Sequence, residues 1–205
     1  MQLRSKYFLL FAVSLLASAK AIAQSGNAVS TPGHQEMDLA VTYTEQYSNL
    51  VSTPTFWHSG GSVEFSTQLY HGFGLAANAT GTQIDSSDNH GIGLSLVTVT
   101  FGPRYTWYHP IGAEKKHSLA IYGQGLLGQG WGFNSYFPSP TGVQTDSIAL
   151  ALQVGGGVDV GLSRHFGIRA FQADWVRTQF PNATTDVQNT LRLAAGVVFR
   201  FGQKN

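Results

Sequence analysis

The last strand-like stretch of the chain, residues 191–201, constrains the possible folds more than any other part of the sequence. Its residues alternate between two kinds, and a period of two is that of a β-strand whose faces have different surroundings. One face is apolar at six successive positions: Leu191, Leu193, Ala195, Val197, Phe199 and Phe201. The other face carries Arg192 and Arg200, small residues and a single valine. An unbroken apolar face that ends in two aromatic side chains is typical of a strand that faces lipid.

The start of the chain has the features of a secretory signal peptide. A basic N-terminus is followed by an apolar stretch at residues 7–17 and by small residues in an Ala-x-Ala pattern that ends at Ala23. The apolar stretch is too short to span a membrane as a helix. We therefore expect cleavage after Ala23, so that residues 1–23 are the signal peptide and residues 24–35 a short periplasmic leader. The chain has no cysteine, which excludes a lipid attachment site and a disulfide framework.

The exported part of the chain is nearly neutral and poor in charge. Of the 12 Lys and Arg side chains of the full chain, Arg4, Lys6 and Lys20 fall in the signal peptide, which leaves nine against 11 acidic side chains. This balance gives no reason to expect nucleic acid as a partner. Over the whole chain 11% of residues are charged, 12% are aromatic and 24 are glycine, which favours a lipid-embedded β-barrel over a soluble domain. No later stretch offers the 18 apolar residues of a membrane helix, so a closed barrel is the structure that remains.

Seven further stretches alternate in the same way, and with the closing strand they make eight. We expect them at about 36–47, 60–70, 73–82, 94–108, 118–131, 148–162 and 166–178. The face of 148–162 that lacks bulk must line the interior of a narrow barrel. The glycine-rich stretch 118–131 does not reveal which face points inward. For 166–178 two arrangements are open: one puts Gln172 and Asp174 inside, and the other puts Arg169 there.

The predicted fold class is therefore an all-β, eight-stranded antiparallel up-and-down transmembrane β-barrel. It covers residues 36–201 and is followed by a C-terminal tail at 202–205. The connections alternate between long and short, which is typical of an outer-membrane barrel with both termini and the short turns in the periplasm. Pro103 falls inside a strand, where it would remove a ladder hydrogen bond, so we expect a local distortion there.

Several of these features together resemble the small OmpA-type outer-membrane β-barrel domain. They are the signal peptide, the eight strands, the run Gly102-Pro103-Arg104-Tyr105 and the closing run Gly196-Val197-Val198-Phe199-Arg200-Phe201. The resemblance covers the whole mature chain and implies the bacterial outer membrane, with outer-membrane lipid around the barrel. Such barrels end on an aromatic residue that the barrel-assembly machinery reads. Phe201 matches that role, with Phe199 before it, although four residues follow.

The candidate site is a set of charged side chains that the alternation places in the lumen: Asp38, Glu64, Arg104, Asp159, Asp174, Arg192 and Arg200. Charges of both signs in a narrow interior must pair, because an unpaired buried charge is very costly. We expect Asp38 to pair with Arg200, and Asp174 with Arg192. Arg104 should lie within reach of Glu64 or Asp159. We interpret this network as a structural plug, with a gate or selectivity filter as the alternative.

Other sites are disfavoured by their context. The run Gly123–Gly128 matches a dinucleotide-binding pattern, but two prolines and no helix follow it. The turn Glu114–His117 and His109 lack the geometry of a metal site. None of the seven histidines is followed two residues later by serine, and no G-x-S-x-G run occurs, which disfavours a lipid-modifying enzyme. We expect no catalytic residue, no metal and no cofactor.

Aromatic residues in or near the predicted loops leave one further possibility, an adhesive surface. They are Trp57, Trp131, Phe133, Tyr136 and Phe137. We favour the aromatic belt that anchors such barrels at the membrane interface. The sequence thus predicts a monomeric barrel with a structural or cell-surface interaction role and an unknown surface partner. A narrow channel for small solutes is the main alternative function.

Overall fold

The structure is a computed structural model that describes residues 37–48, 56–84, 94–111, 117–135, 137–139, 142–181 and 186–201. The strands are β1 (Met37–Ser48), β2 (Phe56–Tyr70), β3 (Phe73–Ile84), β4 (Leu94–Ile111), β5 (His117–Phe133), β6 (Phe137–Ser139), β7 (Gly142–Gln144), β8 (Ser147–Gly161), β9 (Phe166–Thr178) and β10 (Gln188–Phe201). The described residues contain no helix that is long and apolar enough to cross a membrane. The predicted signal peptide, leader and C-terminal tail lie outside the described residues.

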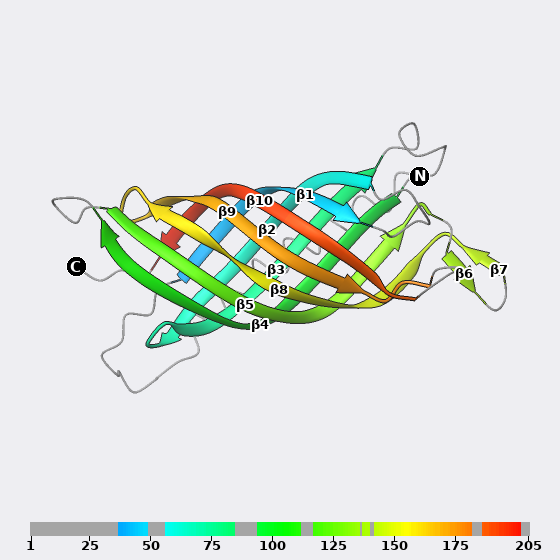
Figure 1. Cartoon of the computed structure of the whole chain (residues 1–205), viewed down its shortest axis with the longest axis horizontal. Coiled ribbons are helices and arrows are strands. Elements are labelled where there is room, and N and C mark those ends of the chain that lie inside the picture. Colours follow the sequence, from blue (N-terminus) through cyan, green and yellow to red (C-terminus); the bar gives the residue numbers. More distant parts are fainter. Residues whose placement is uncertain are drawn as a thin grey trace. The chain divides into compact units, whose positions relative to one another are not determined.

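Eight of these strands close into one antiparallel barrel, which confirms the predicted fold class (Figure 1). Their order is β1-β10-β9-β8-β5-β4-β3-β2, and β2 pairs back onto β1. The closure joins the last strand to the first over the whole length of β1, from Met37↔Phe201 to Ser48↔Thr190. A closed barrel leaves no open sheet edge, so every strand finds partners on both sides.

The strands are staggered as they pass around the barrel. Following the pairs once around from Gln46 leads through Arg192, Asp174, Gly155, Gln124, Arg104 and Gly74 to Gln68. Gln46 itself pairs directly with His58, ten residues from Gln68. This offset is a shear number of 10, which tilts the strands against the barrel axis and leaves a lumen narrow enough for side chains to fill.

The two ends of the barrel differ in their connections. The short-turn end holds Met37, Phe201 and the connections at 71–72, 112–116 and 162–165. His71 and Gly72 both have positive φ, 43° and 87°, as a two-residue hairpin requires. The long-loop end holds the connections at 49–55, 85–93, 134–146 and 179–187. This alternation of lengths is the one that the sequence predicts.

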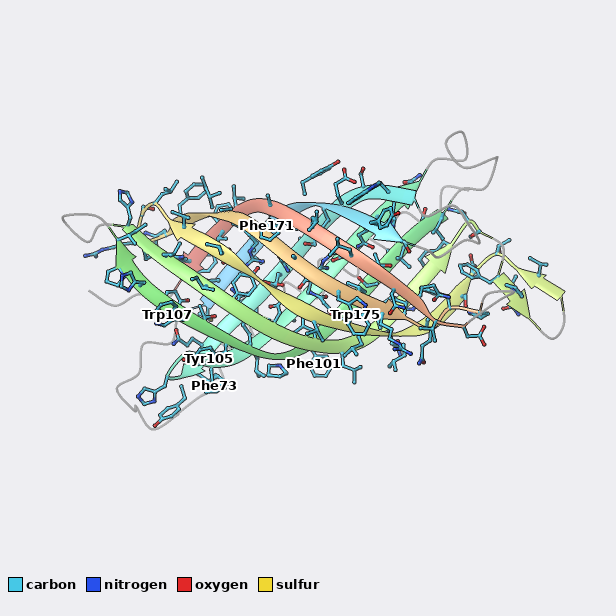
Figure 2. All side chains as sticks on the ribbon, in the orientation of Figure 1. Phe73, Phe101, Tyr105, Trp107, Phe171 and Trp175 are labelled. Atoms are coloured by element: carbon cyan, nitrogen blue, oxygen red, sulfur yellow. The ribbon has the colours of Figure 1, made fainter. Side chains whose placement is uncertain are left out.

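The two faces of the strands divide as the alternation predicts. On β8, the polar Gln153 and Asp159 are buried in the lumen, whereas Leu150 and Val154 are exposed on the outer wall. Figure 2 shows aromatic side chains that project from the outer wall, labelled Phe73, Phe101, Tyr105, Trp107, Phe171 and Trp175. The outer wall is therefore apolar and the lumen polar, the reverse of a soluble barrel.

Strand β9 satisfies both of the arrangements that the sequence left open. Its pairing with β8 shifts between Val158↔Phe171 and Asp159↔Arg169, and its pairing with β10 shifts between Ala194 and Gly196. This is a β-bulge, in which consecutive residues Ala170 and Phe171 both face outward. Arg169, which precedes the bulge in the sequence, and Gln172, which follows it, therefore both point into the lumen, where both are buried.

The structure corrects the sequence in two places at the long-loop end. β2 begins at Phe56, so the first loop is shorter than the predicted 48–59. The predicted loop at 132–146 contains a hairpin, because β6 pairs with β7 from Phe137↔Gln144 to Ser139↔Gly142.

The distortion expected at Pro103 affects the pairing of β4 on one side only. At Gly102 and Pro103, β4 is not paired with β5, and the pairing resumes beyond them in the same register. The pairing of β4 with β3 is continuous through both residues.

The bulge generates a first testable prediction. Deleting Ala170 removes one of the two consecutive outward residues, so Arg169 and Gln172 should both stay in the lumen in regular alternation. Deleting Ala173, which lies outside the bulge, should instead make Gln172 and Asp174 consecutive and turn one of them, with the rest of its segment, toward lipid. Either the Arg169–Glu64 or the Asp174–Arg192 ion pair is then broken, which costs about 3–5 kcal/mol. We expect the Ala173 deletion to lose heat-modifiable migration in electrophoresis, the mark of a folded barrel, and the Ala170 deletion to keep it. Equal behaviour of the two deletions would contradict this account.

Candidate functional site

Glu64 on β2 lies at the centre of the lumen and receives side chains from four other strands. Its Oε1 atom accepts hydrogen bonds from Arg104 Nη1 on β4 and Arg169 Nη1 on β9, both at 2.7 Å. Its Oε2 atom accepts from Gln124 Nε2 on β5 at 2.9 Å and from Asn78 Nδ2 on β3 at 3.3 Å. Both carboxylate oxygens are thus saturated, which is what makes a buried charge tolerable.

Asp159 on β8 completes a ring of four charges of alternating sign. Arg169 donates to it through two atoms, Nε to Oδ1 at 2.8 Å and Nη2 to Oδ2 at 3.0 Å. Such a bidentate arginine–carboxylate contact fixes the relative orientation of the two side chains and also pairs their charges. Arg104 Nη2 lies 3.6 Å from Asp159 Oδ2. Each arginine of the ring therefore contacts both carboxylates.

Tyr122 on β5 packs against both arginines of this ring. The guanidinium carbon of Arg104 lies 3.6 Å from the centre of the Tyr122 ring, and that of Arg169 lies 4.7 Å from it. These are cation–π distances, and the contacts are strengthened by burial. Gly157 on β8 makes room for the tyrosine, because a Cβ atom there would lie 2.6 Å from the Tyr122 hydroxyl.

A second cluster joins the ring on the side of the long-loop end. Arg192 on β10 donates to Asp174 Oδ2 through Nη2 at 2.8 Å and to Asn78 Oδ1 at 2.9 Å. Gln172 donates to Asp174 at 2.9 Å and accepts from Arg169 at 2.9 Å. The contacts therefore form a closed circuit from Glu64 through Asn78, Arg192, Asp174, Gln172 and Arg169 back to Glu64. The ring and this second cluster together contain three arginines and three carboxylates, so their charges balance.

The short-turn end of the lumen holds a further, looser pair. Arg200 Nε lies 3.9 Å from Asp38 Oδ1, and Arg200 Nη1 donates to Ser118 Oγ at 2.7 Å. A small cavity of about 10 Å³ lies beside Asp38 and Arg104 and is lined mainly by polar side chains. This volume is at the lower limit for a single water molecule.

An apolar cluster, which we call the mouth seal, lies at the long-loop end of the lumen. It consists of Leu94, Leu96, Phe137, Ala149 and Phe180. The rings of Phe137 and Phe180 lie 5.6 Å apart, and the two residues are 4% and 1% exposed. Gly132 and Gly130 leave the space that these rings occupy, since Cβ atoms there would lie 2.5 Å from Phe137 and 3.2 Å from Phe180.

Gln188 holds the mouth seal in place. Its side chain accepts a hydrogen bond from the backbone N–H of Phe180 and donates one to the Phe180 carbonyl, both at 2.9 Å.

Phe137 is the first residue of the β6–β7 hairpin, and all three residues of β7, Gly142–Gln144, are exposed. The interpretation of Phe137 as part of an aromatic belt is therefore wrong, because its ring is buried inside the mouth. Trp57 is exposed on the outer wall, Trp131 and Phe133 are half-buried, and Tyr136 lies outside the described residues.

The structure places all seven charged residues of the candidate site in the lumen. It brings together the pairs that the sequence suggested, Asp38 with Arg200 and Asp174 with Arg192, and Arg104 contacts both Glu64 and Asp159. The sequence pattern left Arg169 and Gln172 open, and Tyr122, Gln124 and Asn78 were not among the predicted site residues. The glycines of β5 hid the inward face that carries Tyr122 and Gln124. Within the described ranges no group of three or more His, Cys, Asp or Glu residues could hold a metal ion.

Comparisons with solved structures identify the class of fold. Ail, the attachment invasion locus protein of Yersinia pestis, superposes with a TM-score of 0.54 at 17% identity, over 82% of this chain and 100% of Ail. Its complex with the heparin analogue sucrose octasulfate gives 0.51 at 19% identity, with the same coverage. Neisserial surface protein A gives 0.53 at 11% identity, over 82% of this chain and 98% of that protein.

The chain therefore has the fold of the small eight-stranded outer-membrane β-barrels. At these identities the likeness concerns the fold and not the activity. No family model and no curated protein matches the sequence.

Glu64 carries the second testable prediction. Glu64→Leu removes the acceptor shared by Arg104 and Arg169, and breaking a buried ion pair costs about 3–5 kcal/mol. We expect the free energy of unfolding in urea, followed by tryptophan fluorescence in lipid vesicles, to fall by this amount. Ser66→Ala is the matched control, since Ser66 is buried two residues along the same face of β2. Equal stability of the two variants would show that the circuit does not hold the barrel together.

Proposed function

We propose that the protein is a closed barrel of the bacterial outer membrane, with a structural or cell-surface interaction role and no enzymatic activity. The observation that carries this proposal is that the lumen is blocked at two levels by different chemistry. The ion-pair circuit around Glu64 fills the middle of the barrel, and the mouth seal closes the long-loop end.

The two barriers oppose the passage of solutes in different ways. A polar solute would have to displace Phe137 and Phe180 from an apolar cluster, where it finds no hydrogen-bond partner. It would then have to separate arginines from carboxylates in the buried circuit, which leaves charges uncompensated. Net neutrality of the circuit also gives the lumen no preference for ions of one sign. These points support a plug over a selectivity filter.

The location and orientation follow from the outer wall and from the connections. Apolar and aromatic side chains cover the outer face of the strands, so outer-membrane lipid is the surrounding partner. The short-turn end faces the periplasm and the long-loop end faces outward in barrels of this type. The exposed β6–β7 hairpin then lies on the cell surface. Because the closed barrel has no unpaired strand edge, a monomer is expected.

A surface role is supported by analogy as well as by geometry. The structural neighbour Ail is an attachment invasion protein, and one of its structures holds a heparin analogue. That evidence belongs to Ail. For the present chain it supports a search for partners at the long-loop end. A narrow channel and a lipid-modifying enzyme are the alternatives.

Planar-bilayer conductance tests the proposal directly. We expect refolded protein to give no steady single-channel openings, because both barriers are intact. Folded, inserted protein is verified by heat-modifiable migration of material recovered from the membrane. Steady openings that change when Arg104→Gln or Asp174→Asn removes one charge from the lumen would favour the channel. A mass shift of lipid A on expression would favour the enzyme.

We also propose that Phe201 serves as the assembly signal, together with Phe199. Both side chains are exposed on the outer face of β10, where assembly factors can reach them. Phe201→Ala should lower the amount of barrel in the outer membrane severalfold in cell fractionation, because recognition is weakened. Spontaneous refolding of the same variant into vesicles should proceed as in the parent. A variant impaired equally in both settings would indicate a packing role instead.

A further inference from the structure

The outer wall carries a polar and aromatic group of side chains at the long-loop end of β1 and β2. Three successive rungs of this strand pair face outward: Tyr43↔Gly61, Glu45↔Ser59 and Tyr47↔Trp57. The rings of Tyr47 and Trp57 lie 5.1 Å apart with an interplanar angle of 42°. All three rings are open to the surroundings, with Tyr43 61%, Trp57 52% and Tyr47 38% exposed.

Glu45 lies between these rings. Its Oε1 atom accepts hydrogen bonds from the hydroxyl of Tyr43 and, at 2.9 Å, from that of Ser59. The carboxylate is thereby held in a fixed orientation on the surface. Among the residues that the structure describes, Glu45 forms no ion pair. On the neighbouring strand β10, Leu193 and Leu191 stand opposite Glu45 and Tyr47, so the surroundings on that side are apolar.

The position of this carboxylate is unusual for the barrel. On the strands within the described ranges, Glu45 is the single acidic side chain that faces outward; Asp38, Glu64, Asp159 and Asp174 all face the lumen. Aromatic pairs also occur at the short-turn end, where Phe73 and Tyr105 lie 4.8 Å apart, but on the strands no outward carboxylate stands among them. An aromatic belt alone explains the rings at both ends and leaves Glu45 unexplained.

Three aromatic rings with one carboxylate are the chemistry of a site for a quaternary ammonium group. The ring faces attract the diffuse positive charge, and the methyl groups make apolar contacts that a hydrated ammonium ion cannot make. Tyr43 and Tyr47 are four residues apart, about 13–14 Å along an antiparallel strand. The Tyr43 side chain extends toward Tyr47 as far as the Glu45 carboxylate, so a compact cation beside this carboxylate lies between the two rings. Gly61 leaves the space beside Tyr43 open, since the nearest atom to a Cβ there is the Thr42 carbonyl oxygen at 3.5 Å.

We propose that Tyr43, Glu45, Tyr47 and Trp57 form a binding site for a quaternary ammonium group, such as that of choline. The inference deepens the proposed surface role and rests on it for the side of the membrane that the site faces. The group could belong to a soluble molecule or to the headgroup of a phosphatidylcholine membrane. The site lies on the outer wall and not in the lumen, so its failure and a failure of the conductance test are distinguishable.

The test measures binding of choline to the folded barrel in nanodiscs of phosphatidylglycerol, which contain no quaternary ammonium group. Saturation-transfer NMR of the choline methyl protons reports binding without relying on tryptophan fluorescence. The matched control ligand is 3,3-dimethylbutan-1-ol, which has the shape of choline without its charge. We expect choline to bind with a dissociation constant on the order of millimolar, and the neutral isostere to bind more weakly.

Matched variants locate the site. Glu45→Gln keeps the shape of the side chain and should weaken choline binding about two- to fivefold. Trp57→Leu should weaken it by a similar factor. Trp107→Leu removes an equally exposed tryptophan at the short-turn end and should leave binding unchanged. Heat-modifiable migration verifies that each variant is folded.

A second arm identifies the source of the group. Flotation of nanodisc-embedded barrel with phosphatidylcholine vesicles, but not with phosphatidylethanolamine vesicles, assigns the group to a lipid headgroup. Choline binding without such capture assigns it to a soluble molecule. The proposal is overturned if choline binds no better than its neutral isostere, or if Glu45→Gln and Trp57→Leu bind choline as the parent does.

Discussion

The lumen depends on one constraint, that every charge taken out of water must meet an opposite charge and satisfied hydrogen bonds. The Glu64 carboxylate satisfies this constraint because it accepts hydrogen bonds from side chains on four other strands, those of Arg104, Arg169, Gln124 and Asn78. Three of these strands, β4, β5 and β9, have no backbone pairing with β2, so a single carboxylate ties together parts of the barrel that the sheet connects only through other strands. The same constraint favours the plug proposed above, because an open path would expose these groups separately.

Small and large residues on neighbouring strands complement each other throughout the lumen. Gly157 admits the Tyr122 hydroxyl, and Gly155 admits the Asp174 carboxylate, which would lie 2.4 Å from a Cβ at that position. At the mouth, Gly132 and Phe137 form the corresponding pair. The glycines that make the sequence look featureless on these faces are thus the spaces that the plug requires.

Much of the fold could be predicted from alternation, and much of the site followed from it. On strands with one apolar face, such as β8 and β10, the alternation indicates which residues point inward. Asp159 and Arg192 could therefore be assigned to the lumen from the sequence. The remainder depended on features that a period of two cannot express. The bulge at Ala170 changes the inward face within one strand, so neither of the two arrangements considered for β9 was sufficient alone. On β5, glycines occupy both faces and conceal Tyr122. The hairpin that carries Phe137 is only three residues long on each side, and the two prolines near it indicated a loop.

The circuit of side chains also bears on how the barrel is completed. It joins Asn78 on β3 to Arg192 on β10, the last strand of the chain. A partly built sheet that lacks β10 leaves Asp174 without its arginine and two strand edges without partners. On such a sheet, water would have to solvate Asp174 in place of the arginine. The joining of the first strand to the last therefore also supplies the partner of this carboxylate and encloses both within the barrel.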